Sequence, residues 1–276
     1  MYSRGKQKTL GAKNLFKQGT INCFVIDYHI HSAYSLDGKF PPSSYIECAE
    51  EKHMREIGFS EHVDLDPTLW GYNFLDYSSY QKTLEALQSR TAVCVRCGIE
   101  VSYQQHLERT IRDYLSTIEC DFVIGSVHEV NRIPMDHTFF DRFSPVQYFE
   151  SVEDMVASGM FDIVGHLEYF KRWGSTYSSS QFSEEICLLL QVMIDRNVAL
   201  EVNTSGLRHP AQDTYPSLKV LHLYKQLGGE LITLGSDAHH VHDLAFHFQP
   251  VIGQLKSQGF HTIATFRKRT LTLTEL

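Results

Sequence analysis

The fold of this chain is decided by "VIDYHIHSAYSLDGKF", residues 25–40. The stretch opens with hydrophobic, partly β-branched residues that predict a buried strand. Asp27, His29 and His31 follow at every second position. Because alternate residues of a strand point to the same side, we expect one carboxylate and two imidazoles to share a face where this strand ends.

Six further apolar runs have the length and β-branched content of buried parallel strands. Amphipathic stretches typical of helices separate them, and Ser43, Ser144 and Ser183 are the expected caps of three of these helices. The alternation of strand and helix predicts a parallel sheet covered by helices. The runs are "EIGFSEH", "VCVRCGIEV", "DFVIGSVH", "FDIVGH", "VALEVN" and "LITLGSD".

Nearly every one of these predicted strands ends in polar residues. Their positions favour a closed barrel over an open doubly wound sheet. The carboxyl ends of barrel strands converge on one mouth, whereas those of an open sheet spread along a line. We therefore expect a single α/β barrel domain at residues 21–276, preceded by a basic arm at 1–20. The polar residues are His29, His31, His62, Glu100, His128, His166, Glu201, Asn203, Asp237 and His239.

Composition argues against several classes of function. The formal net charge is −8, and the chain has no stripe of lysine and arginine, which argues against a polynucleotide as partner. No apolar run reaches the length of about eighteen residues that a membrane span needs. Residues 1–20 lack the apolar core and cleavage site of a secretory signal, so we expect a cytoplasmic protein.

The six cysteines are expected to be reduced, buried thiols, because they lie mostly in apolar segments of a long chain without a secretory signal. Cys94 and Cys97 form a CxxC motif, which could indicate a redox or zinc site. The motif lies inside a strand-like run, and the chain has no second CxxC. We therefore favour a structural interpretation of both thiols.

Six ordered motifs resemble the metal-binding motifs of the PHP (polymerase and histidinol phosphatase) superfamily and, within it, those of the stand-alone histidinol-phosphate phosphatases. The resemblance extends from about residue 25 to beyond residue 240. It implies a distorted (β/α)7 barrel, similar to a TIM barrel, that holds three divalent metal ions (zinc, iron or manganese). The motifs are "DYHIHSAYSLDG", "GFSEH", "GIEV", "GSVHEV", "DIVGH" and "LGSDAHH".

The resemblance also implies which residues hold the ions. Many members of the superfamily have a histidine where this chain has Asp37, and a carboxylate there favours a harder ion. Asp27 is expected to orient one of the imidazoles through its free N–H, with plain burial as the alternative. The implied ligands are His29, His31, Glu100 and Asp237 for the first ion, Glu100, His128 and His166 for the second, and Asp37, His62 and His239 for the third.

The implied reaction is the hydrolysis of L-histidinol phosphate to L-histidinol and phosphate, a step of histidine biosynthesis. Imidazole and carboxylate ligands without a thiolate are typical of hydrolytic ions, and a hydroxide bridging two ions would attack phosphorus. Glu100, Asp237 and His239 are the expected catalytic residues. Either Asp237 or a metal-bound water could handle the proton.

Three arginines are candidates for binding the phosphate of a small phosphomonoester, since guanidinium groups match pairs of phosphate oxygens. Arg172 and Arg208 follow predicted strands and occupy positions like those of phosphate-binding arginines in the resembling enzymes, and Arg132 is the third. Glu129 is a candidate contact for the amine or imidazole of histidinol. Ser102 is a departure, because an acidic residue commonly follows "GIEV" in the family.

Two other functions are compatible with the sequence. The chain could be a phosphoesterase of the same superfamily that acts on nucleotides or on DNA 3′ ends, although its acidic balance and the absence of a fused polymerase region count against a polynucleotide. It could also be a non-catalytic protein that keeps a metal site for stability. The sequence does not indicate an oligomeric state.

Overall fold

The computed structural model describes residues 25–173 and 177–276, so the basic arm expected at 1–20 lies outside the described residues. The main body is a parallel sheet of seven strands in the order β1-β2-β3-β4-β7-β8-β9. The seven strands expected from the sequence are confirmed. They are β1 (Ile26–Ile30), β2 (Glu56–Val63), β3 (Cys94–Ser102), β4 (Phe122–Ser126), β7 (Ile163–Val164), β8 (Ala199–Asn203) and β9 (Ile232–Gly235).

The two edges of this sheet meet and nearly close a barrel. Ile30 at the end of β1 forms a parallel bridge with Ala238, just after β9. The His31 N–H donates to the Ala238 carbonyl at 3.0 Å, and the Ala238 N–H donates to the His29 carbonyl at 3.1 Å. The expected barrel is therefore confirmed, and the open doubly wound sheet is excluded.

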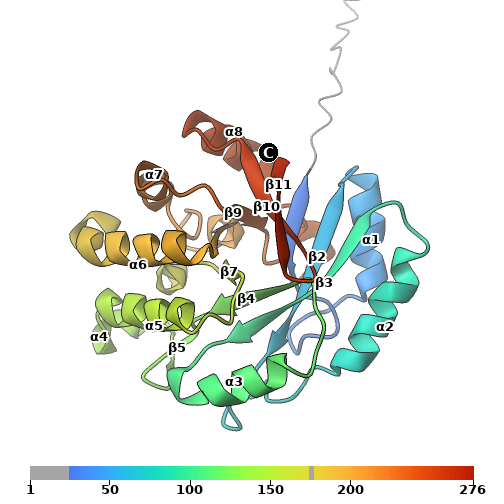
Figure 1. The fold of residues 1–276 in the computed structure, drawn as a ribbon, viewed down its shortest axis with the longest axis horizontal. Coiled ribbons are helices and arrows are strands. Elements are labelled where there is room, and N and C mark those ends of the chain that lie inside the picture. Colours follow the sequence, from blue (N-terminus) through green and yellow to red (C-terminus); the bar gives the residue numbers. More distant parts are fainter. Residues whose placement is uncertain (1–24, 174–176) are drawn as a thin grey trace, which may run out of the picture.

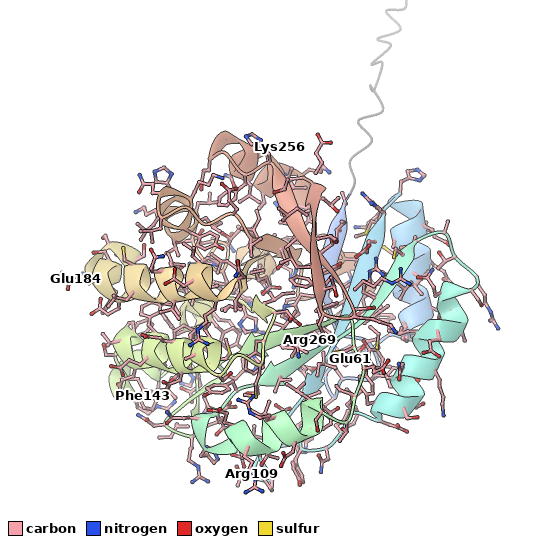
Figure 2. All side chains as sticks on the ribbon, in the orientation of Figure 1. Glu61, Arg109, Phe143, Glu184, Lys256 and Arg269 are labelled. Atoms are coloured by element: carbon pink, nitrogen blue, oxygen red, sulfur yellow. The ribbon has the colours of Figure 1, made fainter. Side chains whose placement is uncertain are left out.

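Helices surround the barrel as an outer ring (Figure 1). Charged side chains such as Arg109, Glu184 and Lys256 lie on the outside of this ring (Figure 2). In the described ranges, no helix has both the length and the hydropathy that crossing a bilayer requires. The helices are α1 (Pro42–Glu51), α2 (Tyr77–Gln88), α3 (Glu108–Leu115), α4 (Phe139–Arg142), α5 (Pro145–Ala157), α6 (Ser183–Arg196), α7 (Leu218–Gln226) and α8 (Phe248–Ser257).

One of the three expected helix caps is confirmed. The Ser144 hydroxyl accepts a hydrogen bond from the backbone of α5, and Gln147 completes a capping box. Ser43 is not a cap, because α1 begins at Pro42, whose fixed φ suits a first helical position. Ser183 is already the first residue of α6, which continues directly from a short 3₁₀ turn at Ser179–Phe182.

The register of β1 shifts near the end of the strand. Ile26 pairs with Glu56 of β2 but Ile30 pairs with Phe59, so four steps along β1 match three along β2. Such an irregularity changes which side chains point to which face. As a result, the consecutive residues Tyr28 and His29 both contact other strands of the barrel: Tyr28 stacks on Phe122 of β4 at 4.7 Å, and His29 binds Glu201 of β8.

Two small hairpins that the sequence did not predict extend the barrel at its ends. The hairpin of β10 (Thr262–Arg267) and β11 (Thr270–Glu275) covers the amino ends of the strands, where Arg269 pairs with Asp162 at 2.8 Å just before β7. Figure 1 shows this hairpin close to the middle of the barrel. The hairpin of β5 (Glu129–Val130) and β6 (Ile133–Pro134) follows β4 at the opposite, carboxyl end.

Candidate metal centre

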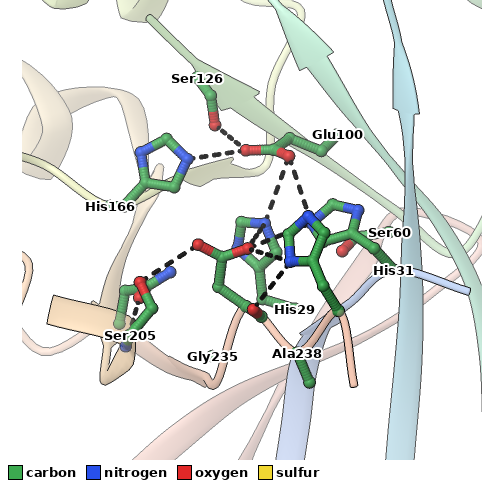
Figure 3. Close-up of polar contacts among 12 residues, drawn as sticks. His29, His31, Ser60, Glu100, Ser126, His166, Ser205, Gly235 and Ala238 are labelled. Carbon is green, nitrogen blue, oxygen red and sulfur yellow. Dashed lines mark hydrogen bonds and ion pairs between the residues drawn. The ribbon is translucent and has the colours of Figure 1, made fainter. Parts of the chain in front are cut away.

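The nine residues that the sequence predicts as metal ligands converge at the carboxyl end of the barrel. They come from the ends of β1, β2, β3, β4, β7 and β9 and from the segments directly after these strands. This clustering follows from the parallel strands, whose carboxyl ends all open on one mouth. Figure 3 shows part of the cluster around Glu100.

Glu100 is the centre of the cluster, and its two oxygens face different imidazoles. Its Oε2 lies 2.9 Å from His62 Nδ1, 3.3 Å from His29 Nε2 and 3.5 Å from His31 Nε2. Its Oε1 lies 2.9 Å from His166 Nε2 and 3.8 Å from His128 Nε2, and accepts a hydrogen bond from Ser126 Oγ at 2.5 Å. One buried carboxylate therefore links two groups of ligand atoms.

Three groups of residues in the described chain could each hold an ion, since their ligand atoms lie within 4.8 Å of one another. They overlap at Glu100 and His31. The two predicted aspartates extend them: Asp237 Oδ1 lies 3.4 Å from His31 Nε2, and Asp37 Oδ2 lies 3.0 Å from His239 Nε2. The groups are His29, His31 and Glu100, then Glu100, His128 and His166, and finally His31, His62 and His239.

The donor atoms fit divalent cations. The Nε2 atoms of His29 and His31 are fully buried, yet they have no hydrogen-bond partner in the described structure. Burial without a partner is costly for a polar atom, and an ion at this position would remove the cost. All the donors are imidazole nitrogens and carboxylate oxygens, a set that suits zinc, iron or manganese.

The charges of the cluster also suit cations. Although burial favours the neutral acid, the surrounding histidines hold the pKa of Glu100 and of Asp237 well below the ordinary range, so both are ionised. Burial and neighbouring imidazoles lower the pKa of His31 to about 3, which leaves that ring neutral. Burial opposes the charged form of His29 as well, but Glu201, Glu100 and Asp237 raise its pKa well above the usual value, so an ion must displace its proton.

Glu201 orients two of the candidate ligands. Its Oε1 lies 2.6 Å from His29 Nδ1, and its Oε2 accepts from the His166 backbone N–H at 2.6 Å. Asn203 donates a 3.1 Å hydrogen bond to the same carboxylate and so supports it. Gly235 on β9 allows the approach, because a Cβ there would lie 1.9 Å from Glu201 Oε1.

The orienting role expected of Asp27 is wrong. The Asp27 carboxylate accepts from the backbone N–H groups of Ser236 and Ala245, each at 2.9 Å, and from the Ser236 hydroxyl. It makes no hydrogen bond to an imidazole in the described chain; its contact with His29 is to the backbone N–H, at 3.2 Å. The register shift in β1 is the reason, because it separates Asp27 from the face that carries His29 and His31.

Glu61 is a supporting residue that the sequence analysis did not single out. This buried carboxylate accepts from Ser32, through its backbone N–H at 3.0 Å and its hydroxyl at 2.5 Å, and from the Ser35 hydroxyl at 2.6 Å. It thereby holds the segment between His31 and Asp37. Its position directly before His62 in "GFSEH" is the one signal that could have drawn attention to it.

A cavity of about 450 Å³ opens over the cluster. Arg172 lines it and lies over the Tyr169 ring at 5.5 Å, while Tyr169 in turn contacts the ring of His166 at 4.7 Å. Arg208 Nη2 donates to the carbonyls of Ser236 and Asp237 at 2.9 and 3.0 Å. This arginine therefore holds the backbone of a ligand loop, while its Nη1 is buried without a hydrogen-bond partner among the described residues, and its role in binding phosphate stays a prediction.

The structure separates Arg132 from the cluster. This exposed arginine lies on the turn between β5 and β6, with a φ of 65°, and lines a neighbouring cavity. Glu129, by contrast, lines both cavities and accepts from Ser102 Oγ at 2.8 Å. The β5–β6 hairpin that carries Arg132 could not be predicted from the distance between Arg132 and His128 along the chain, and a role of Arg132 in binding substrate stays a prediction.

The CxxC motif forms no site with other residues in the described chain. Cys94 and Cys97 both lie in β3 and are free thiols, and Cys97 is within 3.6 Å of the Tyr77 hydroxyl. Burial raises the pKa of Cys97 to about 11, so the thiolate is scarce near neutral pH.

Comparison with known proteins gives concordant results. A family model described as the PHP domain matches residues 27–205. The histidinol-phosphatase of Lactococcus lactis is 29% identical over 255 residues, covering 87% of this chain and 94% of the relative. A probable histidinol-phosphatase of Deinococcus radiodurans is 26% identical, covering 90% and 98%. The crystal structure of the Lactococcus lactis histidinol phosphate phosphatase with zinc, L-histidinol and phosphate superposes with a TM-score of 0.78 at 26% identity, covering 90% and 98%.

Proposed function

This chain belongs to the PHP domain family, and on that premise we propose that it is a metal-dependent histidinol-phosphate phosphatase. It hydrolyses L-histidinol phosphate to L-histidinol and phosphate. Support comes from relatives named histidinol-phosphatase that match nearly the whole chain, and from the related structure that contains both products and zinc. The enzyme class is a phosphoric monoester hydrolase.

The observation that carries this proposal is the arrangement around Glu100. Its two oxygens face separate groups of imidazoles, and the cavity above them is lined by Arg172. We infer that the three overlapping groups hold three divalent ions, with Glu100 bridging two of them. The proposed ligands are His29, His31, Asp37, His62, Glu100, His128, His166, Asp237 and His239.

When bound, ions of this kind polarise a phosphate ester and provide a strongly nucleophilic oxygen at neutral pH. The chain's own residues place and balance these charges. Glu100, Asp37 and Asp237 contribute three negative charges, fewer than the six positive charges of three divalent ions, so the mouth attracts a phosphate dianion. Glu201 keeps the His29 ring oriented through its Nδ1.

Four residues at or near the mouth have proposed roles around the substrate. Arg172 presents a guanidinium to the cavity and binds phosphate oxygens, whereas Arg208 keeps the backbone of Ser236 and Asp237 in place. The Asp237 carboxylate faces His31 and His239 and accepts from Ser205 Oγ at 3.1 Å, which positions it to carry the proton between water and leaving group. His239 stands beside it at 3.5 Å.

The function is tested by phosphate release from L-histidinol phosphate, a 3′,5′-bisnucleotide and single-stranded DNA, with metal content measured on the same sample. We expect turnover of L-histidinol phosphate to exceed the others by at least about a hundred-fold and to disappear when a chelator removes the ions. Preference for the nucleotide or DNA would refute the proposal in favour of another phosphoesterase. Bound metal without hydrolysis of any phosphomonoester would identify a non-catalytic metal protein.

A further inference from the structure

Arg172, which lines the cavity over the cluster, is carried by a short 3₁₀ turn at Tyr169–Trp173 that we call the arginine turn. The turn follows β7 and His166, and Glu168 lies immediately before it. Glu168 has a φ of 70°, in the left-handed region that residues with a side chain rarely adopt. Such a conformation persists only where the surroundings hold it, so strong contacts must keep Glu168 in place.

The Glu168 carboxylate is fully buried and accepts hydrogen bonds from three directions. Its Oε2 accepts from Lys171 Nζ at 3.0 Å, within the arginine turn, and from the Ser217 backbone N–H at 2.6 Å. Its Oε1 accepts from the Tyr177 hydroxyl at 2.7 Å. One carboxylate therefore ties the start of the turn to its interior, to the segment after it and to the residue that precedes α7.

Lys171 connects the arginine turn to a second strand of the barrel. Its side chain is buried, and Nζ also donates to Asp213 Oδ2 and to the Thr214 carbonyl, each at 3.1 Å. The next residue, Tyr215, exchanges backbone hydrogen bonds of 2.8 and 2.9 Å with Asn203 at the end of β8. The turn after β7 is thus fastened to the segment that pairs with β8.

Lys171 and Arg172 are adjacent cations with opposite surroundings. Lys171 is paired with two carboxylates, those of Glu168 and Asp213. Among the residues that the structure describes, Arg172 forms no ion pair with a carboxylate. Its Nη1 donates to the Tyr169 hydroxyl at 3.4 Å, and its guanidinium lies over that ring. The lysine thus neutralises both carboxylates, and the arginine stays available for an anion in the cavity.

From this arrangement we propose that Glu168 is a positioning residue, which keeps Arg172 at the mouth and thereby sets the affinity for the phosphate group. This inference rests on the proposed function, in which Arg172 binds phosphate oxygens. Glu168 is not among the described residues that line the cavity, so it acts through the arginine turn and not on phosphate itself. A turn that is already fixed lowers the entropy cost of ordering the arginine when phosphate binds.

The proposal is tested on the metal-loaded full chain by measuring its affinity for inorganic phosphate, both by calorimetry and by competitive inhibition. Glu168→Gln removes the charge that holds Lys171 and one of the two acceptor oxygens, and it should weaken phosphate binding about ten-fold. The KM for L-histidinol phosphate should rise by a similar factor, while kcat falls less than about three-fold.

Arg172→Ala separates positioning from a general loss of stability. In that background, Glu168→Gln should change phosphate affinity less than about two-fold, because the side chain through which it acts is gone. A merely structural role would instead weaken binding by the same factor whether or not the arginine is present. Effects of the two substitutions that simply add would therefore overturn the proposal.

Glu56→Gln is the matched control, because it neutralises another buried carboxylate paired with a cation, Arg96, at the amino end of the barrel. It should lower the free energy of unfolding in urea and leave phosphate affinity unchanged.

Tyr177→Phe decides the matter if Glu168→Gln does not fold. It removes one hydrogen bond from the Glu168 carboxylate and should weaken phosphate binding about two- to three-fold, but only when Arg172 is present. An unchanged affinity in this variant would then count against the positioning role.

The outcomes separate this inference from the proposed function. If the wild-type chain binds phosphate but does not hydrolyse L-histidinol phosphate, the proposed function is wrong, and the phosphate affinities still decide the role of Glu168. If the wild type hydrolyses this substrate and Glu168→Gln leaves phosphate affinity unchanged, the function stands and the positioning role is wrong. A chain that binds no phosphate at all would overturn both.

Discussion

Strands β1, β2 and β3 carry two buried polar clusters, one at each end of the barrel, and the two differ in how completely their atoms are paired. Tyr28, Glu56 and Arg96 form the cluster at the amino end, which we call the lower cluster. His29, His31 and Glu100 form the core of the cluster at the carboxyl end, which we call the upper cluster. Both draw on β1 and β3, and His62 of β2 also contacts Glu100 of the upper cluster, so the contrast reflects their side chains.

The lower cluster is closed on itself. The Arg96 guanidinium donates to both oxygens of Glu56, at 2.9 and 3.1 Å, and the Tyr28 hydroxyl also donates to that carboxylate. The Tyr28 oxygen then accepts the Phe266 N–H at 3.0 Å from the covering hairpin. A buried network in which the charges are paired in this way leaves no coordination position for an ion.

The upper cluster is left open. His29 and His31 each keep a buried Nε2 without a hydrogen-bond partner, and several carboxylate oxygens point at the same space. The lower cluster thus pairs its polar groups with one another, whereas the upper cluster leaves nitrogen atoms unpaired at the proposed ion sites. Four substitutions would sharpen or break this division.

Glu100→Gln should have the largest effect. An amide cannot bridge two cations, so we expect kcat for L-histidinol phosphate to fall at least about a thousand-fold and bound metal to fall with it. Phosphate release and elemental analysis of the same sample would check this. Glu119→Gln, on the exposed surface, is the control. Turnover close to that of the wild type would remove Glu100 from the bridging position.

Arg96→Met tests the lower cluster, where stability rather than activity should change. The substitution leaves the Glu56 carboxylate buried without its cation, which should lower the free energy of unfolding by about 3 kcal/mol. Urea denaturation measures the loss, and kcat should stay within about two-fold of the wild type. The division between the clusters would be disproved by a loss of metal from the folded variant. Arg96→Lys, which keeps the charge, should recover part of the stability.

Glu201→Gln should have an intermediate effect. The substitution replaces one of the two Glu201 oxygens, which bind the His29 ring and the His166 backbone N–H, by an NH2 group that cannot accept. We therefore expect metal affinity to fall about ten- to a hundred-fold. Titration with a competing chelator would measure it. Activity at saturating metal should largely return, which distinguishes an orienting residue from a ligand. An unchanged affinity would mean that burial alone orients the imidazole.

Cys97→Ser should have the smallest effect. The thiol belongs to neither cluster, and its raised pKa of about 11 makes it unreactive near neutral pH. We expect changes of less than about two-fold in activity and metal content, and no alkylation of the folded protein at pH 7.5. Alkylation in urea provides the positive control. Rapid alkylation of Cys97 in the native state would revive the redox interpretation of the CxxC motif.

The sequence predicted the barrel and the convergence of eight of the nine candidate ligands because both depend on local patterns, whereas Asp37 was implied only by the resemblance to the PHP superfamily. Apolar runs alternating with amphipathic stretches predict parallel strands, and parallel strands bring residues such as His62, His166 and His239 to one mouth regardless of their separation along the chain. The chemical nature of the site then followed from its residue types.

The partners of these residues could not be predicted in the same way. Asp27 and Glu201 are both acidic and both close to a strand end, yet only Glu201 contacts an imidazole. The deciding feature is a register shift of one residue in β1, and no pattern in residues 25–40 reveals it. Arg132 and Arg172 likewise both follow strands. Arg172 lines the cavity over the cluster, whereas Arg132 lies on the turn of the β5–β6 hairpin.

The sequence by itself therefore determined the barrel, its catalytic end and the kinds of side chain gathered there. Periodicity and strand direction are properties of short segments, which makes them readable from the chain. Only the tertiary structure decided which carboxylate orients His29, which arginine lines the cavity and which loop faces the substrate. Those assignments depend on contacts of a few ångströms between segments that are distant along the chain. A shift of one residue in strand register changes which side chains form these contacts.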